Sequence, residues 1–90
     1  MIDIIIDGRS MGTKEMAHLH LKWALKAPEY YGKNLDALWD VLSTYDKAIN
    51  ISLINKECLI EDLGDYGESI IEVFQDAEKE NQNITFQIID

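Results

Sequence analysis

Cysteine and proline are almost absent from this chain, which has one of each in 90 residues. A single cysteine, Cys58, cannot form a disulfide within the chain, so we expect a core without covalent cross-links in a reducing compartment. We interpret Cys58 as a small, partly buried apolar residue rather than a nucleophile. Ninety residues suffice for one hydrophobic core, and we therefore expect a single domain over residues 1–90.

Long hydrophobic runs are also missing. The N-terminal segment IDIIID contains acids, is too short to span a membrane, and has no preceding basic segment like that of a signal peptide. We therefore expect a cytoplasmic protein that does not bind membranes.

Positive charge is scarce as well. Eight Lys and Arg residues stand against seventeen Asp and Glu residues, which gives a formal net charge of -9 at pH 7. Such a surface repels RNA, DNA and anionic lipid and attracts basic proteins, although high charge also serves solubility alone. We expect a basic protein partner and no direct nucleic-acid binding.

Signatures of cofactor and metal chemistry are lacking too. The sequence has no phosphate-binding loop, no zinc-ligand spacing and no nucleophile triad. His18 and His20, two apart on a predicted helix, point to different sides and cannot share a metal ion, so we interpret His18 as a packed or surface residue. We expect no cofactor and no metal site.

Three short apolar segments rich in β-branched residues predict strands at residues 2–7, 49–54 and 84–89. Because these strands are apolar on both faces, we expect a parallel sheet covered by helices. The segments between them predict four helices, which gives the order β-α-α-β-α-α-β with right-handed crossovers. The fold class is therefore α/β, with a three-stranded parallel sheet flanked by four helices.

Helix boundaries follow from capping residues and apolar stripes. We expect Thr13, Asn34 and Asn55 to cap the first three helices, and the fourth to run from about residue 66 to 80. The first helix should end near residue 26, because Pro28 restricts the residue before it. Its apolar stripe contains Ala17, Leu21, Ala24 and Leu25, widened by Met16, Leu19 and Trp23.

The stretch PEYYGKNLDALWD, residues 28–40, contains the most unusual charge pattern. Asp36 and Asp40 lie one helical turn apart, and no Lys or Arg occurs between residues 34 and 45. The face formed by Leu35, Leu38, Trp39 and Leu42 should pack on the core, so the two aspartates should project into solvent. Two tyrosines precede them, and exposed aromatics beside charges are typical of binding anchors. An ordinary solvated face is the alternative.

A second acidic surface runs along the predicted last helix, where residues 68, 72, 76 and 80 are all Glu or Asp and form one ridge. We interpret Glu68 and Glu72 as solvated surface. For Asp76 and Glu80, solvated surface and partner binding both stay open.

The two exposed aspartates, Asp36 and Asp40, could in principle hold Mg²⁺ or act as acid and base, but a catalytic acid needs burial to raise its pKa. An exposed helix face offers no burial, so we expect no enzymatic activity.

With these residues in view, the chain resembles the barstar family, the intracellular inhibitors of secreted guanyl-preferring ribonucleases such as barnase. The likeness covers all 90 positions and is densest in PEYYGKNLDALWD, ESIIEVFQDAEKE and ITFQII. It implies a small parallel sheet flanked by four helices. It also implies inhibition by mimicry, in which Asp40 takes the place of the scissile RNA phosphate and Asp36 pairs with a neighbouring arginine of the enzyme.

The resemblance assigns further contacts around these two acids. Tyr30 would lie against the catalytic side of the enzyme, Glu80 would add a peripheral ion pair, and Trp39 would mainly support the core. Together with our own interpretation, the candidate partner-binding residues are Tyr30, Tyr31, Gly32, Asn34, Leu35, Asp36, Trp39, Asp40, Tyr45, Asp76 and Glu80.

Three positions depart from the family pattern. Tyr45 replaces a tryptophan that reaches the interface, Asp76 replaces a glutamate, and Lys33 reverses a negative charge in the loop. The resemblance implies a monomeric inhibitor that forms a 1:1 complex with a basic, barnase-like ribonuclease of the extracellular type, made by the same cell. An acidic interaction module that binds another basic toxin or nucleic-acid-binding protein remains the alternative.

Overall fold

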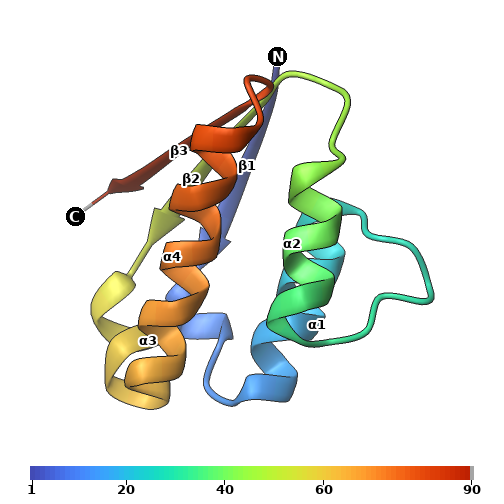
Figure 1. Ribbon diagram of the computed structural model, residues 1–90. Helices are drawn as coiled ribbons and strands as arrows, with labels where there is room; N and C mark the ends of the chain where they lie inside the picture. The colour runs from blue at the N-terminus through green and yellow to red at the C-terminus, as the bar shows by residue number, and fades with distance from the viewer. Residues whose placement is uncertain (90) are drawn as a thin grey trace.

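A computed structural model describes residues 1–89 and shows three strands and four helices (Figure 1). The elements are, in chain order, β1 (Ile2–Asp7), the 3₁₀ turn η1 (Gly8–Ser10), α1 (Lys14–Leu25), α2 (Leu35–Ser43), β2 (Ile49–Ile54), α3 (Lys56–Leu63), α4 (Asp65–Glu80) and β3 (Ile84–Ile89). The predicted order β-α-α-β-α-α-β and the α/β class with one three-stranded parallel sheet are confirmed.

The strands lie in the order β1-β2-β3, and both neighbouring pairs are parallel. Ile4, Ile51 and Phe86 are aligned across the sheet, and residues aligned in this way point to the same face. On this face Ile51 is fully buried and Phe86 is nearly so. It is the core face of the sheet.

The opposite face of the sheet is open, so the prediction of strands covered on both faces is wrong. Ile5 and Ile89 on this face are 60% and 48% exposed. Ser52 and Gln87 are aligned with Ile5 on this face, and the Gln87 amide donates to the Ser52 hydroxyl across 2.9 Å. The reason lies in the strand order: two right-handed crossovers that advance in the same direction leave their helices on one face of the sheet.

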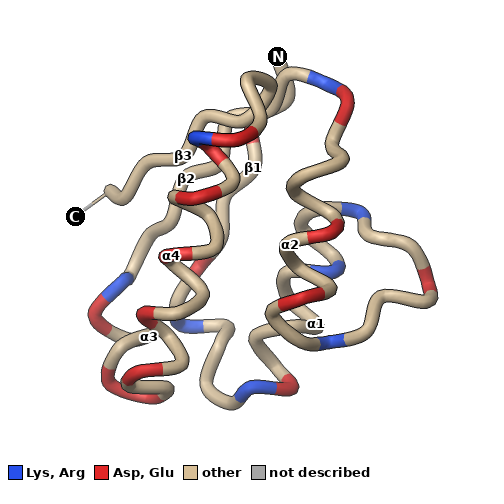
Figure 2. Tube along the Cα trace, in the orientation of Figure 1, with Lys and Arg blue, Asp and Glu red and all other residues tan. Residues whose placement is uncertain are grey.

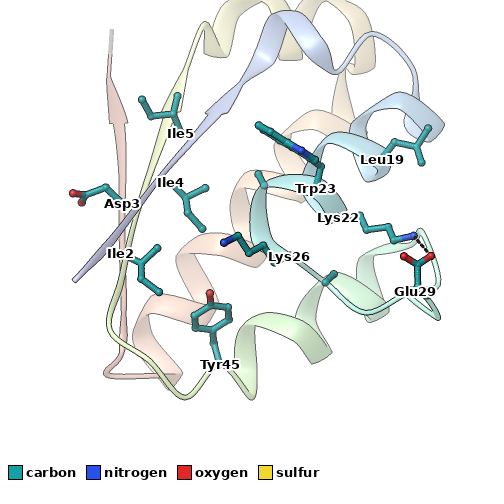
Figure 3. Close-up of a pocket in the computed structure, with 12 residues that line it drawn as sticks. Ile2, Asp3, Ile4, Ile5, Leu19, Lys22, Trp23, Lys26, Glu29 and Tyr45 are labelled. Atoms are coloured by element: carbon teal, nitrogen blue, oxygen red, sulfur yellow. Dashed lines mark hydrogen bonds and ion pairs between the residues drawn. The ribbon is translucent and has the colours of Figure 1, made fainter.

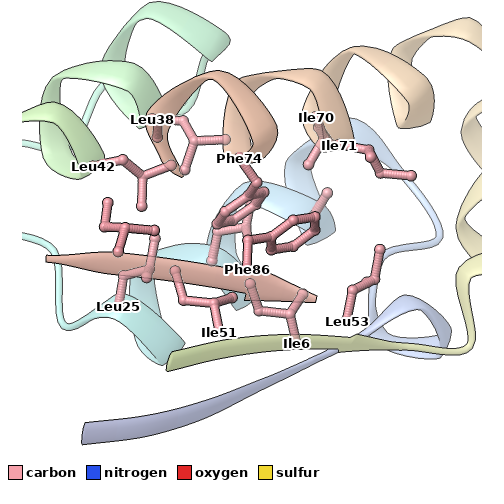
Figure 4. Packing of buried hydrophobic residues seen from close by; sticks show 14 of the residues in the cluster. Ile6, Leu25, Leu38, Leu42, Ile51, Leu53, Ile70, Ile71, Phe74 and Phe86 are labelled. Atoms are coloured by element: carbon pink, nitrogen blue, oxygen red, sulfur yellow. The ribbon is translucent and has the colours of Figure 1, made fainter. Parts of the chain in front are cut away.

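The core lies between this sheet and the helices (Figure 4). Leu38 and Leu42 of α2 are fully buried, and the rings of Phe74 in α4 and Phe86 in β3 stack with centroids 5.0 Å apart. α4 therefore joins the sheet to α2, which forms the outer layer of the molecule. This packing fixes one side of α2 in the core and leaves the other side to solvent.

Two of the three predicted caps are confirmed. The Thr13 hydroxyl accepts a hydrogen bond from the Met16 amide at 3.1 Å, and the Asn34 side chain accepts one from the Ala37 amide at 2.7 Å. Asn55 precedes α3 as predicted but makes no capping bond; its side chain donates to Asp7 at 2.8 Å instead. Asn55 is left-handed, with φ of 56°, a conformation that asparagine tolerates better than most residues.

α1 ends where predicted, but its outer stripe does not pack. Its last helical residue is Leu25, and Lys26 closes it in the left-handed conformation with φ of 53°, two residues before Pro28. The expectation that Met16, Leu19 and Trp23 widen the buried stripe is wrong, since they are 49%, 44% and 76% exposed. α1 packs beside the edge strand β1, and within the described residues no further strand lies there to cover these side chains.

An open hollow of about 870 Å³ lies between this side of α1 and β1 (Figure 3). Its apolar walls include Leu19 and Trp23 from α1 and Ile2 and Ile5 from β1.

Candidate functional site

The segment between Pro28 and Ser43 carries most of the predicted site residues and is fixed at its centre by Asn34. The Asn34 side chain holds the Ala37 amide, and its backbone carbonyl accepts from the Leu38 amide at 3.0 Å. α2 therefore starts at a defined residue. With Leu38 and Leu42 anchored in the core, its opposite face must point outward.

Asp36 and Asp40 lie on that outward face, and both are exposed. Within residues 1–89 the ion pairs are Arg9–Asp7 and Lys22–Glu29, so neither aspartate is neutralised by its own chain. Figure 2 shows two acidic segments along α2 and no basic segment on it. The positive end of the helix dipole stabilises Asp36 in the first turn, whereas Asp40 has little such compensation. This pair is a free acidic surface on a rigid support.

The two tyrosines of the preceding loop point in opposite directions. Tyr30 is 87% exposed, in agreement with its predicted place on the surface. Tyr31 is only 7% exposed, so the prediction of an exposed aromatic anchor is wrong at this position. Its hydroxyl lies 2.8 Å from Nδ1 of His18, which draws the ring into the space between the loop and α1. The aromatic surface beside the acids therefore comes from Tyr30.

His18 was not identified from the sequence as part of this region. It is 1% exposed, and its Nε2 lies 2.6 Å from the hydroxyl of Tyr66 in α4. Burial lowers the pKa of His18 and raises the pKa of Tyr31, so both groups are neutral near pH 7. The spacing of His18 to Leu21 and Leu25, three and seven residues on, was the available signal, because it places the imidazole on the buried stripe of α1.

The remaining loop and helix positions divide between surface and support. Gly32 and Lys33 are exposed, and Lys33 is left-handed with φ of 54°. Leu35 and Trp39 are half-buried and pack against the core. This placement agrees with a mainly supporting position for Trp39.

The C-terminal end of α2 is held by two asparagines from the turn between α4 and β3. The Asn81 amide donates to the carbonyls of Leu42 and Tyr45, both at 2.9 Å, and the Asn83 amide donates to Tyr45 at 3.2 Å. Carbonyls at the end of a helix have no partner within it, and these amides supply one. α2 is thus fixed at both ends. The Tyr45 side chain is half-buried and lines the hollow beside β1.

The second acidic ridge lies on α4, the helix that packs against α2. Its four members are all exposed: Glu68, Glu72, Asp76 and Glu80. Their neighbour Glu78 differs, because its carboxylate accepts a hydrogen bond from the Phe86 amide at 2.9 Å. Asp76 and Glu80 therefore lie on the surface of the helix that packs against α2.

Metal-binding clusters and membrane-spanning helices would point to other functions. No group of three or more His, Cys, Asp or Glu side chains in residues 1–89 is arranged to hold a metal ion. None of the helices in that range is both long enough and apolar enough to cross a membrane.

Comparison with known proteins then decides the family. A family model described as "Barstar (barnase inhibitor)" matches residues 1–90. The chain belongs to the barstar family. A relative from Bacillus subtilis (strain 168), named "Putative ribonuclease inhibitor YrdF", is 43% identical over 90 residues, which cover 99% of this chain and 98% of the relative. The resemblance found in the sequence is therefore confirmed over the whole length of both proteins.

Proposed function

We propose that this barstar-family protein inhibits a barnase-type, guanyl-preferring ribonuclease by placing the Asp36 and Asp40 carboxylates where the enzyme holds RNA phosphates. Family membership and the name of the relative support ribonuclease inhibition in general, and an inhibitor rather than an enzyme. The observation that carries the specific proposal is the pair of exposed, unneutralised carboxylates on α2.

The rigidity of α2 supports phosphate mimicry. A ribonuclease carries cationic groups where it binds phosphate, so a competitor needs negative charge at a matching spacing. Asn34 fixes the start of α2 and Asn81 holds its end, so the backbone that carries the carboxylates loses little freedom on binding. A ligand ordered in advance avoids part of the entropic cost of association.

The negative charge of the protein favours both its association with a basic ribonuclease and the stability of the resulting complex. A net charge of -9 attracts a basic enzyme and raises the association rate at low salt. Close charge pairs in the barnase–barstar complex, which involves a member of this family, have coupling energies of about 1.5–7 kcal/mol. That range is measured on the family system and is not calculated for this chain.

The residues around the pair have distinct parts in the proposal. Tyr30 lays its exposed ring against the enzyme beside the catalytic groups, and Gly32 brings the loop backbone close. Asp76 and Glu80 add ion pairs at the periphery, and Tyr45 lies at the margin. One inhibitor molecule occupies one active site. The inhibitor protects the RNA of the cell that makes the ribonuclease.

The departures at Lys33, Tyr45 and Asp76 bear on which ribonuclease is the target. Lys33 is exposed in the loop and repels a cationic surface opposite it, unlike the negative charge of the family pattern. We therefore expect the preferred enzyme to differ from barnase in the region that faces Lys33, while its phosphate-binding groups are retained.

An inhibition assay tests the proposal directly. Purified protein should abolish RNA cleavage by at least one barnase-type ribonuclease at equimolar concentration, and Lys33→Glu should improve inhibition of barnase itself. If several enzymes of this type stay fully active at micromolar excess of inhibitor, the proposal fails. Binding to a basic protein that is not a ribonuclease would then favour the alternative of an acidic interaction module.

A further inference from the structure

A single buried imidazole connects three separate parts of the molecule near the proposed binding loop. His18 belongs to α1, and its two ring nitrogens lie 2.8 Å from the hydroxyl of Tyr31 and 2.6 Å from the hydroxyl of Tyr66. Tyr31 belongs to the loop between α1 and α2, and Tyr66 belongs to α4. The histidine is 1% exposed, and its contact with Tyr31 is buried, whereas its contact with Tyr66 is partly buried.

The hydrogen bonds in this cluster have defined directions. A neutral imidazole has one N–H donor and one acceptor nitrogen. One tyrosine hydroxyl must therefore donate to the ring while the other accepts from it. Within residues 1–89 no buried side-chain nitrogen or oxygen lacks a hydrogen-bond partner, so this set is complete. Loss of any one member would leave a buried polar group without its partner, which carries a high free-energy cost.

The bond between Tyr31 and His18 is a buried side-chain hydrogen bond that joins the loop to α1. The loop also has a local bond from the Tyr31 amide to the Pro28 carbonyl, at 2.9 Å. An ion pair joins Lys22 to Glu29, but the Glu29 side chain is 99% exposed, and exposed pairs contribute little. Of these two side-chain contacts between the loop and α1, the buried Tyr31 hydroxyl is therefore the one that holds the loop in position.

The direction of Tyr31 also sets the direction of Tyr30. Adjacent residues in this loop point to opposite sides, since Tyr31 is 7% exposed and Tyr30 is 87% exposed. The same loop leads directly into the Asn34 cap of α2, which orients Asp36. A shift of Tyr31 would therefore be transmitted to the aromatic and the acidic parts of the proposed interface together.

Resting on the proposed function, we infer that His18 is a positioning residue for ribonuclease binding. It touches no partner. It holds Tyr31 inward, and so keeps the loop over residues 28–34 in the conformation that binding requires. The gain is preorganisation, because a loop that is ordered before association does not lose its freedom in the complex.

Two phenylalanine variants separate this role from simple stability. Tyr31→Phe and Tyr66→Phe each remove one hydroxyl from the same imidazole and keep the ring. Tyr66 lies in α4, and within residues 1–89 its hydroxyl hydrogen-bonds to His18 and to no residue of the loop. We expect Tyr31→Phe to weaken inhibition about 3- to 10-fold, the size of one lost hydrogen bond, and Tyr66→Phe to change inhibition less than 2-fold. Both variants should lose thermal stability to a similar extent, because each leaves one nitrogen of His18 without its partner.

A complementary pair of variants tests His18 itself. The Asn amide nitrogen reaches nearly the position of imidazole Nδ1, and the Gln amide nitrogen reaches nearly that of Nε2. His18→Asn should therefore keep the bond to Tyr31 and retain tight inhibition, whereas His18→Gln should lose that bond and weaken inhibition like Tyr31→Phe. If His18 affected stability alone, the strength of inhibition by the two variants would follow their melting temperatures.

Hydrogen exchange in the free protein gives a readout that needs no ribonuclease. In Tyr31→Phe and His18→Gln, the amides of residues 30–34 should exchange at least 3-fold faster than in the parent, with exchange in β2 unchanged. Equal exchange in all four variants, or equal loss of inhibition in Tyr31→Phe and Tyr66→Phe, would overturn the positioning role. Failure of the proposed function would show differently: Asp40→Ala would leave inhibition intact, whatever the loop does.

Discussion

Replacement of Asp40 by asparagine separates binding from folding more sharply than any other change in this chain. The substitution removes the charge and keeps the size of the side chain. In the free protein the Asp40 carboxylate is exposed and makes no ion pair with residues 1–89, so its charge supports no internal contact. The repulsion from Asp36 one turn away costs a few tenths of a kcal/mol, which the variant would regain. Its thermal stability should equal that of the parent or slightly exceed it.

In the complex the same substitution should be costly. Removing one partner of a buried, hydrogen-bonded charge pair weakens association by about 2–5 kcal/mol, which corresponds to about 30- to 5,000-fold in the dissociation constant. The assay is a titration of ribonuclease activity at several inhibitor concentrations, combined with a thermal melt of each free variant. Glu72→Gln is the matched control, since it also removes one exposed helical carboxylate and should change inhibition less than 2-fold.

The reasoning would be refuted by either of two results. An Asp40→Asn variant that inhibits as well as the parent would show that this carboxylate does not occupy a phosphate site. A variant that loses stability along with inhibition would show that Asp40 has an internal role that the structure does not contain.

Three further predictions concern the framework of the site. Asn34→Ala should lower the free energy of unfolding by about 1 kcal/mol in a urea titration and also weaken inhibition, because it removes the cap that starts α2; an unchanged midpoint would contradict the capping role. Burial lowers the pKa of His18 and His20 below the ordinary 6.5, so the folded state binds fewer protons than the unfolded state. Stability should therefore be complete above about pH 7 and fall as the pH drops through and below 6.5, with a smaller slope in His18→Gln; a flat profile between pH 7 and 5 would contradict this. Gly8→Ala should strongly destabilise the fold in a thermal melt, because a Cβ there would lie 2.1 Å from the Asn55 carbonyl oxygen; a melting temperature within a degree of the parent would contradict that packing.

Local patterns in the sequence were sufficient for the strands and for most helix ends. The runs IDIIID, INISLI and ITFQII match β1, β2 and β3 residue for residue. Thr13 and Asn34 cap as predicted, because a side-chain cap depends on residues only three apart. The outward placement of Asp36 and Asp40 follows from the same kind of short-range spacing.

Features that depend on distant segments could not be read in this way. The open face of the sheet follows from the strand order, which hydropathy does not encode. Tyr31 is buried because His18 offers it a hydrogen bond, and the partner lies 13 residues away. The Asn55 side chain does not cap α3 but donates a hydrogen bond to Asp7, 48 residues earlier in the chain. At Tyr31 and Asn55 a long-range hydrogen bond competed with a local preference, whereas the open sheet face and the exposed outer stripe of α1 follow from the strand order.

Competition with RNA is the most direct test of phosphate mimicry. Initial rates of a susceptible ribonuclease should be measured over a range of RNA concentrations at several fixed concentrations of this protein. Occupation of the phosphate site by Asp36 and Asp40 predicts that RNA and inhibitor exclude each other, so the apparent inhibition constant rises in proportion to RNA concentration above KM. An inhibition constant that does not change with RNA concentration would place the protein elsewhere on the enzyme and contradict the account.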